Sequence, residues 1–245
     1  MNFIGIIPAR YASSRFPGKP LADINGKPMV RLVYEKARET LSQVWVATDD
    51  QRIYDAVCSF GGKAVYTSPG HKSGTDRVAE AARIIEKETN FDIVINIQGD
   101  EPFFDPGKID VLKSLFGKGA EIATLVRKVI SEEELNDPNK PKVVLGAGGQ
   151  ALYFSRSPIP FLRDAEPGKW TSVADFWIHI GMYAYKKETL QEITKLQQGK
   201  LELAESLEQL RWLEKGYKIM TAATDSKSFG IDTPEDLKRA LQLFS

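Results

Sequence analysis

The stretch NFIGIIPARYASSRFPGKPL, residues 2–21, contains the pattern that decides the fold. It begins with a short apolar run that stops at Pro8, which predicts a buried strand. Two similar runs follow, QVWVAT (43–48) and DIVINIQ (92–98), with helical patterns between them. Strands and helices that alternate in this order predict an α/β fold, with a mostly parallel sheet covered by helices on both faces.

The helical patterns are apolar residues that recur at helical spacing. They comprise Met29, Leu32, Val33, Ala37 and Leu41 after Pro28, and then Val78, Ala81, Ala82 and Ile85. Further strands are predicted at 151–155, 176–185 and 218–224, and a final helix with Asp232 or Thr233 as its N-cap. No linker or repeat interrupts residues 1–245, so we expect one domain with an inserted, strand-rich arm roughly within 128–185.

Composition excludes several classes of protein. The 33 basic residues balance the 33 acidic ones over 245 residues, which argues against a nucleic-acid partner. No apolar stretch is long enough to cross a membrane and no signal sequence is evident, so we expect a cytoplasmic protein. The one cysteine, Cys58, excludes an internal disulfide and is expected to be a small core residue.

The loop after the first predicted strand is basic. It contains Arg10, Arg15 and Lys19, and no acidic residue precedes Asp23. Ligands of parallel sheets bind beyond the carboxyl ends of the strands, where guanidinium and ammonium groups suit a triphosphate. The glycine fingerprint of dinucleotide-binding proteins is missing, which disfavours an NAD-dependent oxidoreductase. A solvated basic loop without function remains the alternative.

Two aspartates are candidate metal ligands. Asp100 follows the run that ends at Gln98, where it would lie near the phosphate loop, and carboxylates are preferred ligands of Mg²⁺. Asp232 precedes the final helix. Each also has an ordinary structural explanation, because aspartate is common in turns and at helix N-caps.

Seven motifs now form one pattern along nearly the whole chain. They are IIPARYASSRFPGKPL (6–21), HKSGTDR (71–77), NIQGDEP (96–102), ALYFSRSPIP (151–160), IHIGMYAY (178–185), AESLEQLR (204–211) and GIDTPEDL (230–237). In this order they resemble the CMP-KDO synthetases, the 3-deoxy-manno-octulosonate cytidylyltransferases. The loop around 163–175 matches least, and no role is transferred to it.

The resemblance implies a Rossmann-like sheet of the nucleotide-diphospho-sugar transferase type, with the arm within 128–185 serving dimerisation and sugar binding. It also implies a magnesium-dependent homodimer that converts CTP and KDO to CMP-KDO and pyrophosphate for lipopolysaccharide synthesis. By motif position, Arg10, Arg15 and Lys19 would hold the triphosphate, and Asp100 and Asp232 would bind magnesium, so that Arg15, Lys19 and both aspartates would serve the reaction. Cytosine and ribose would be bound by backbone at Ala9 and by Ser73, Gly74 and Arg77. The residues implied for the sugar acid are Gln98, Arg156, His179, Tyr185, Glu208 and Gln209.

Alternatives remain for the residues and for the activity. His179 could be a core histidine, and Gln209 a solvated helix residue. A CMP-sialic acid synthetase shares the first loop, and an amino-substituted KDO could replace KDO with one altered contact. A nucleotide-sugar sensor without catalytic activity belongs to a different class, although the presence of both aspartates and the whole basic loop argues against it.

Overall fold

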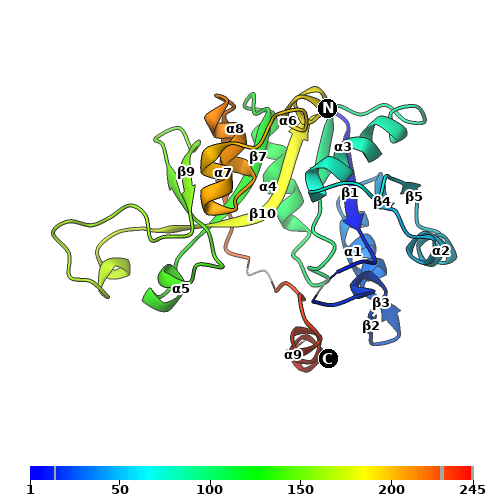
Figure 1. The fold of residues 1–245 in the computed structure, drawn as a ribbon, viewed down its shortest axis with the longest axis horizontal. Coiled ribbons are helices and arrows are strands. Elements are labelled where there is room, and N and C mark those ends of the chain that lie inside the picture. Colours follow the sequence, from blue (N-terminus) through cyan, green and yellow to red (C-terminus); the bar gives the residue numbers. More distant parts are fainter. Residues whose placement is uncertain (14, 227–228, 244–245) are drawn as a thin grey trace. The chain divides into compact units, whose positions relative to one another are not determined.

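The computed structural model describes residues 1–13, 15–226 and 229–243; Ser14 of the basic loop lies outside this range. The chain forms two compact units (Figure 1). Unit 1 contains residues 1–110, 184–194 and 226–245, and unit 2 contains residues 111–183 and 195–225. Most of the predicted arm falls in unit 2, and the prediction of a single domain stays a prediction.

A parallel sheet with the strand order β5-β4-β1-β6 forms the centre of unit 1. Its strands are β1 (Phe3–Ala9), β4 (Val44–Thr48), β5 (Ala64–Tyr66) and β6 (Ile93–Asn96). The register pairs Gly5 of β1 with Val44 on one side and Ile95 on the other. All five residues of β4 are buried, as expected for a strand covered on both faces.

Three helices connect these strands in unit 1: α1 (Met29–Arg38), α2 (Gln51–Ser59) and α3 (Gly74–Ile85). The connections through α1 and α2 move outward from β1 to β5, whereas α3 leads back to β6 on the other side of β1. Right-handed crossovers therefore place α3 on the opposite face from α1 and α2. The reversal leaves a crevice between the carboxyl ends of β1 and β6, where ligands of such sheets bind.

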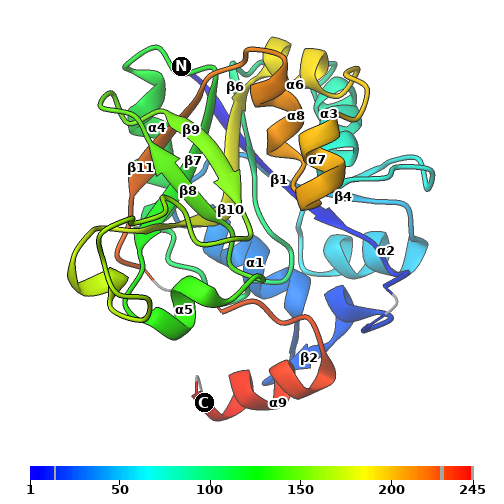
Figure 2. The same ribbon diagram turned by 60° about the vertical axis from the view of Figure 1, so that its left-hand side comes forward.

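The C-terminal segment of the described chain packs back onto unit 1. Helix α9 (Pro234–Leu243) lies near the small hairpin of β2 (Asp23–Ile24) and β3 (Lys27–Pro28), as Figures 1 and 2 show. Ile231 and Ala240 are fully buried in a cluster with Ile24 and Met29. The Ile231 amide also donates a 2.8 Å hydrogen bond to the Asp100 carbonyl, so the residue before Asp232 is held beside the loop after β6.

Most of the remaining elements lie in unit 2. In unit 2 are β7 (Ile122–Lys128), α5 (Glu132–Asn136), β8 (Lys142–Leu145), β9 (Ala151–Ser155), the 3₁₀ turn η2 (Trp170–Ser172), α7 (Lys200–Glu205), α8 (Gln209–Glu214) and β11 (Ile219–Ala223). Strand β11 is parallel to β7, and β8 is antiparallel to β9 and β10. Helix α4 (Gly107–Phe116) and strand β10 (Trp177–Lys186) have residues in both units, whereas α6 (Lys187–Ile193) and the 3₁₀ turn η1 (Lys19–Leu21) lie in unit 1.

The predicted α/β class and its mostly parallel sheet are confirmed. Strands β5, β7 and β8 were not predicted, because short or unevenly apolar runs lack a clear period. The prediction for Cys58 is wrong: its side chain is exposed. Ile53 and Val57 form the buried face of α2, and the next residue after Val57 turns about 100° away from that face.

Among the described residues, no helix is long and apolar enough to cross a membrane.

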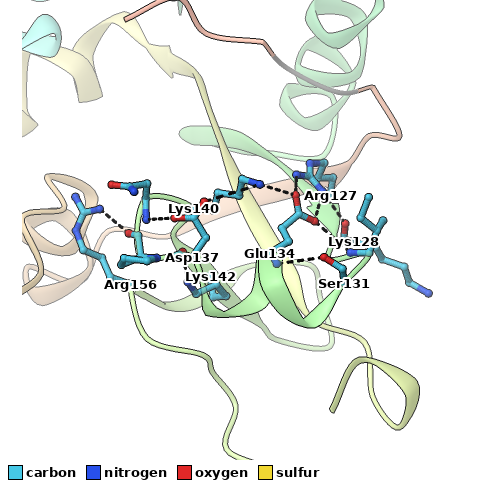
Figure 3. A network of polar contacts seen from close by, with 11 residues as sticks. Arg127, Lys128, Ser131, Glu134, Asp137, Lys140, Lys142 and Arg156 are labelled. Carbon is cyan, nitrogen blue, oxygen red and sulfur yellow. Dashed lines mark hydrogen bonds and ion pairs between the residues drawn. The ribbon is translucent and has the colours of Figure 1, made fainter. Parts of the chain in front are cut away.

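Helix α5 of unit 2 carries a buried carboxylate, Glu134. Glu134 of α5 accepts hydrogen bonds from Arg127, from Lys140 at 3.1 Å and from the Ile130 amide at 3.2 Å, and Figure 3 shows the two cationic side chains converging on it. Its side chain is 8% exposed. The hydrogen bonds from Arg127 outweigh the cost of burial and lower the pKa of Glu134 from 4.5 to about 2.

This pKa predicts an acid-dependent loss of stability. Because the pKa is lowered in the folded state, ionised Glu134 stabilises the protein fully above about pH 4.5, and this contribution of about 3 kcal/mol is lost as the pH falls toward 2. We expect Glu134→Gln to be less stable than wild type at pH 7, and this difference to shrink between pH 4.5 and 2 in urea unfolding. Glu133→Gln, an exposed change on the same helix, is the control. A difference that stays constant with pH would contradict the assignment.

Candidate active site

A cavity of about 300 Å³ opens at the carboxyl ends of β1 and β6. All residues that line it belong to unit 1. The predicted residues among them are Ala9, Arg10, Arg15, Lys19, Ser73, Gly74, Arg77, Gln98, Asp100 and Asp232. The fold thus brings together the candidates for phosphate, cytidine and metal binding, which come from four separate stretches of the chain.

A stack of side chains shapes the basic loop. Gly18 has φ 73°, the left-handed region that glycine adopts most readily, and its amide donates a 2.9 Å hydrogen bond to the Tyr11 carbonyl. A Cβ at position 18 would lie 3.1 Å from the Tyr11 ring. On that ring lies the Arg52 guanidinium, 3.3 Å from the centroid, and Asp50 binds Arg52 at 2.9 and 2.7 Å. Contacts with α2 therefore hold the loop that carries Arg10, Arg15 and Lys19.

The ends of β1 and β6 approach each other closely. A Cβ at Gly99 would lie 3.0 Å from the Pro8 carbonyl oxygen, so a larger residue there would push the two loops apart. Gln98 and Asp100, on either side of Gly99, consequently line the same cavity as Pro8 and Ala9.

Lys19 bridges the two predicted metal ligands. Its Nζ lies 2.9 Å from Asp100 Oδ2 and 3.0 Å from Asp232 Oδ1, while Arg15 binds Asp232 Oδ2 at 3.1 Å. The cap of α9 is Thr233, whose hydroxyl accepts from the Asp236 amide at 3.1 Å. The Asp232 carboxylate is therefore not needed as a helix cap and faces the cations of the loop.

The start of α3 forms another wall of the cavity. Ser73 is its N-cap and accepts from the Asp76 amide at 3.1 Å, which gives this hydroxyl a structural role but leaves its own proton available. Arg77 is 4% exposed, and its guanidinium donates to Thr67 Oγ1 at 2.6 Å and to Asp49 Oδ2 at 3.0 Å. Asp49 follows β4, so two strand ends and one helix fix the orientation of Arg77.

Two ionisable residues of the cavity were not predicted from the sequence. His71 and Lys72 line the cavity beside Ser73, and their place in the HKSGTDR motif was the available signal. His71 Nε2 bonds the carboxylate of Glu80 on α3. Burial raises the pKa of Glu80, but the hydrogen bonds from His71 and the Ser68 amide outweigh this effect and keep the pKa below its usual value.

The residues implied for the sugar acid are divided between the units. Gln98 and the fully buried Tyr185 belong to unit 1, whereas Arg156, Glu208, Gln209 and His179 belong to unit 2. Arg156 donates to backbone carbonyls of Glu205 at 2.7 Å, Pro138 at 2.8 Å and Ser206 at 3.2 Å, so its guanidinium already has a structural role. The part of these residues in sugar binding stays a prediction.

His179 and Gln209 have properties that suit binding within unit 2. Burial lowers the pKa of His179 to about 3, which keeps the imidazole neutral near pH 7. Thr124 Oγ1 lies 3.0 Å from His179 Nε2 and 2.9 Å from the Met182 carbonyl. The Thr124 hydroxyl has one proton, which it donates to the Met182 carbonyl, so it must accept a hydrogen bond from Nε2 of His179. Nε2 therefore carries the proton of the neutral ring, and Nδ1 is left as an acceptor.

Gln209 is 6% exposed, so its interpretation as a solvated residue is wrong. Its Nε2 is buried and has no partner among the described residues. Glu208, the residue before it, is partly exposed, with a carboxylate oxygen 3.7 Å from Arg211.

The carboxylate pair fits one hard cation. Because a single nitrogen atom lies within 3.0 Å of both carboxylates, one ion can contact Asp100 and Asp232 together, and carboxylate oxygens are ligands that Mg²⁺ prefers. Within the described residues, no group of three or more metal-binding side chains occurs. The protein would therefore supply only part of the six ligands that Mg²⁺ requires.

The chain is similar over almost its whole length to known cytidylyltransferases. The chain is 54% identical over 246 residues to a 3-deoxy-manno-octulosonate cytidylyltransferase from Parabacteroides distasonis, covering 98% of this chain and 97% of that protein. It is 47% identical over 247 residues to an 8-amino-3,8-dideoxy-manno-octulosonate cytidylyltransferase from a Shewanella species, covering 99% and 98%.

A solved structure of a CMP:2-keto-3-deoxy-manno-octonic acid synthetase complexed with CTP superposes with a TM-score of 0.90 at 42% identity, covering 99% of this chain and 98% of that one. A glucose-1-phosphate thymidylyltransferase structure from Bacillus anthracis, at 17% identity and a TM-score of 0.67, shares the fold. Residues 4–219 match the family described as Cytidylyltransferase, and the chain belongs to that family.

Proposed function

We propose that the protein transfers the cytidylyl group of CTP to the anomeric hydroxyl of 3-deoxy-manno-octulosonate, giving CMP-KDO and pyrophosphate for lipopolysaccharide synthesis. The observation that carries the proposal is the cavity in which a basic loop and two carboxylates meet. The extent and identity of the match to a relative named for this sugar acid support the choice of substrate.

The reaction asks the protein mainly to position its substrates and to balance charge. The sugar hydroxyl oxygen attacks the α-phosphorus, the bond to the β-phosphate oxygen breaks, and the hydroxyl proton is released to solvent. Arg10, Arg15 and Lys19 would hold the triphosphate and neutralise the departing pyrophosphate. Arg77, fixed by Asp49 and Thr67, would contact the cytidine portion from its buried position.

Magnesium is the proposed cofactor, held by Asp100 and Asp232. When bound there, it would lower the pKa of the attacking hydroxyl and balance charge on the α-phosphate. Asp100 would hold the ion at the carboxyl end of β6, which it follows. Asp232 would lie close enough to bind the same ion because the amide of Ile231, the residue before it, donates a hydrogen bond to the Asp100 carbonyl.

A homodimer in the cytoplasm completes the proposal. Unit 2 exposes large apolar side chains, with Phe161 at 74%, Ile130 at 69% and Val173 at 66%, which supports a protein contact there. The cytoplasm supplies CTP. Sedimentation velocity of the wild type and of Phe161→Asp would test the dimer.

The central test is pyrophosphate release by purified protein with CTP, magnesium and one sugar acid at a time. We expect release with KDO, loss of release with EDTA, and much slower release with other nucleoside triphosphates or sialic acid. The 8-amino sugar is included because one relative is named for it. Faster turnover of that sugar would change the substrate, and binding of CTP without turnover of any sugar would favour the sensor.

Asp100→Asn tests the metal assignment. Loss of one anionic ligand should lower kcat by about 100-fold or more at saturating magnesium, since the ion stabilises charge that develops in the reaction. Asp164→Asn, a change of an exposed aspartate in unit 2, should leave kcat unchanged. Near-normal turnover of Asp100→Asn would remove this residue from the metal site.

Arg10→Ala tests the phosphate assignment. The Arg10 guanidinium lines the cavity and has no hydrogen bond or ion pair with the described residues, so it is available to a ligand. We expect the KM for CTP to rise by about tenfold or more, as for loss of one charge-assisted hydrogen bond, with a smaller effect on the KM for KDO. A larger effect on KDO would contradict the role, and Arg163→Ala is the control with an exposed arginine.

A further inference from the structure

The ammonium group of Lys19 lies where a cation shared by Asp100 and Asp232 would lie. Its Nζ is 2.9 Å and 3.0 Å from the two carboxylates, and the Lys19 side chain is only 15% exposed. A magnesium ion bound to the same oxygens at about 2.0–2.1 Å would need this space. The ammonium and the metal therefore exclude each other.

We propose that Lys19 is an internal counter-ion that occupies the metal position in the free protein and must leave before a divalent cation binds. The inference rests on the proposed function for the metal site and goes beyond it. It predicts that nucleotide and metal bind cooperatively, because phosphates that attract Lys19 away from the aspartates vacate the position for the metal.

The charges around the aspartates support this exchange. Without a cation, two carboxylates within reach of one atom would repel each other. Lys19 removes this repulsion, and Arg15 contributes less because its side chain is 65% exposed and its attraction to Asp232 is screened by water. A metal that approaches the free protein must displace an ion pair before it gains its own ligands.

The limited number of protein ligands points the same way. Among the described side chains, no third metal-binding group joins the two aspartates. The remaining ligands must come from water or from the nucleotide. A metal that displaces Lys19 without nucleotide therefore gains only two protein ligands in exchange for the ion pairs that are broken. A bound triphosphate supplies oxygen ligands for the metal and a new partner for Lys19 at the same time.

The switch requires movement of one side chain only. Lys19 begins η1, and its amide donates to the Phe16 carbonyl at 3.2 Å, while Gly18 is held against Tyr11. The backbone is thus fixed, and the Lys19 side chain lines the same cavity as Arg10 and Arg15. A rotamer change would move the ammonium from the carboxylates to the phosphates.

The test is a titration of the protein with Mn²⁺ in the absence of nucleotide. The concentration of free Mn²⁺ is measured by electron paramagnetic resonance. Lys19→Met keeps most of the side-chain length and removes the charge. We expect it to bind Mn²⁺ about tenfold or more tightly than wild type, the change that loss of one charge-assisted competing hydrogen bond would give. Lys72→Met removes a charge from the same cavity without a carboxylate contact, and its Mn²⁺ affinity should stay within about twofold of wild type.

The double variant Lys19→Met/Asp100→Asn identifies the site, because it should lose the added affinity. A second series repeats the titration with a non-hydrolysable CTP analogue and is corrected for Mn²⁺ bound by the nucleotide itself. The analogue should strengthen Mn²⁺ binding strongly in wild type and less in Lys19→Met. Circular dichroism confirms folding of each variant.

Equal Mn²⁺ affinity of wild type and Lys19→Met would overturn the proposal, as would equal coupling in both. Equal tightening in Lys19→Met and Lys72→Met would reduce the effect to overall charge and also overturn it. These measurements need no turnover, so failure of the proposed reaction, seen as absence of pyrophosphate release, is a separate result.

Discussion

The candidate site depends on the position of β1 between β4 and β6. Parallel pairing on both sides brings the loops after β1 and β6 to one edge of the sheet, where the chain reverses its direction of winding. The close approach of Gly99 to the Pro8 carbonyl fixes the distance between these loops. A basic loop and a carboxylate far apart in sequence become neighbours for this reason.

Two further constraints complete the site. Burial of Ile231 with Ile24 and Met29 returns the C-terminal segment to unit 1, and the hydrogen bond from Ile231 to Asp100 sets the place of Asp232. The stack of Arg52 on Tyr11 holds the basic loop from the side of α2. Apolar packing and one cation–π contact therefore position the charged groups, and the charged groups themselves need not hold the fold together.

Some features of the structure could be predicted from the sequence, and others could not. Strand β1 was predictable because it is a continuous apolar run that stops at Pro8. Helices α1 and α3 were predictable because their apolar residues recur at helical spacing. The cap of α9 remained undecided between Asp232 and Thr233, since both residue types cap helices, and the hydrogen bond to Thr233 resolved it. Burial of Gln209 and exposure of Cys58 could not be read locally, because each depends on which helix face meets the rest of the unit.

By itself the sequence determined the α/β class, the basic loop and the candidate residues. The spacing of apolar residues and the order of motifs can both be read along the chain without knowing which segments are neighbours in space. Tertiary structure alone decided that Lys19 lies between Asp100 and Asp232, which are 81 and 213 positions away. It also decided that Asp49 fixes Arg77 and that His71 joins the cavity. Distances between side chains follow from strand order and packing, and no local pattern contains them.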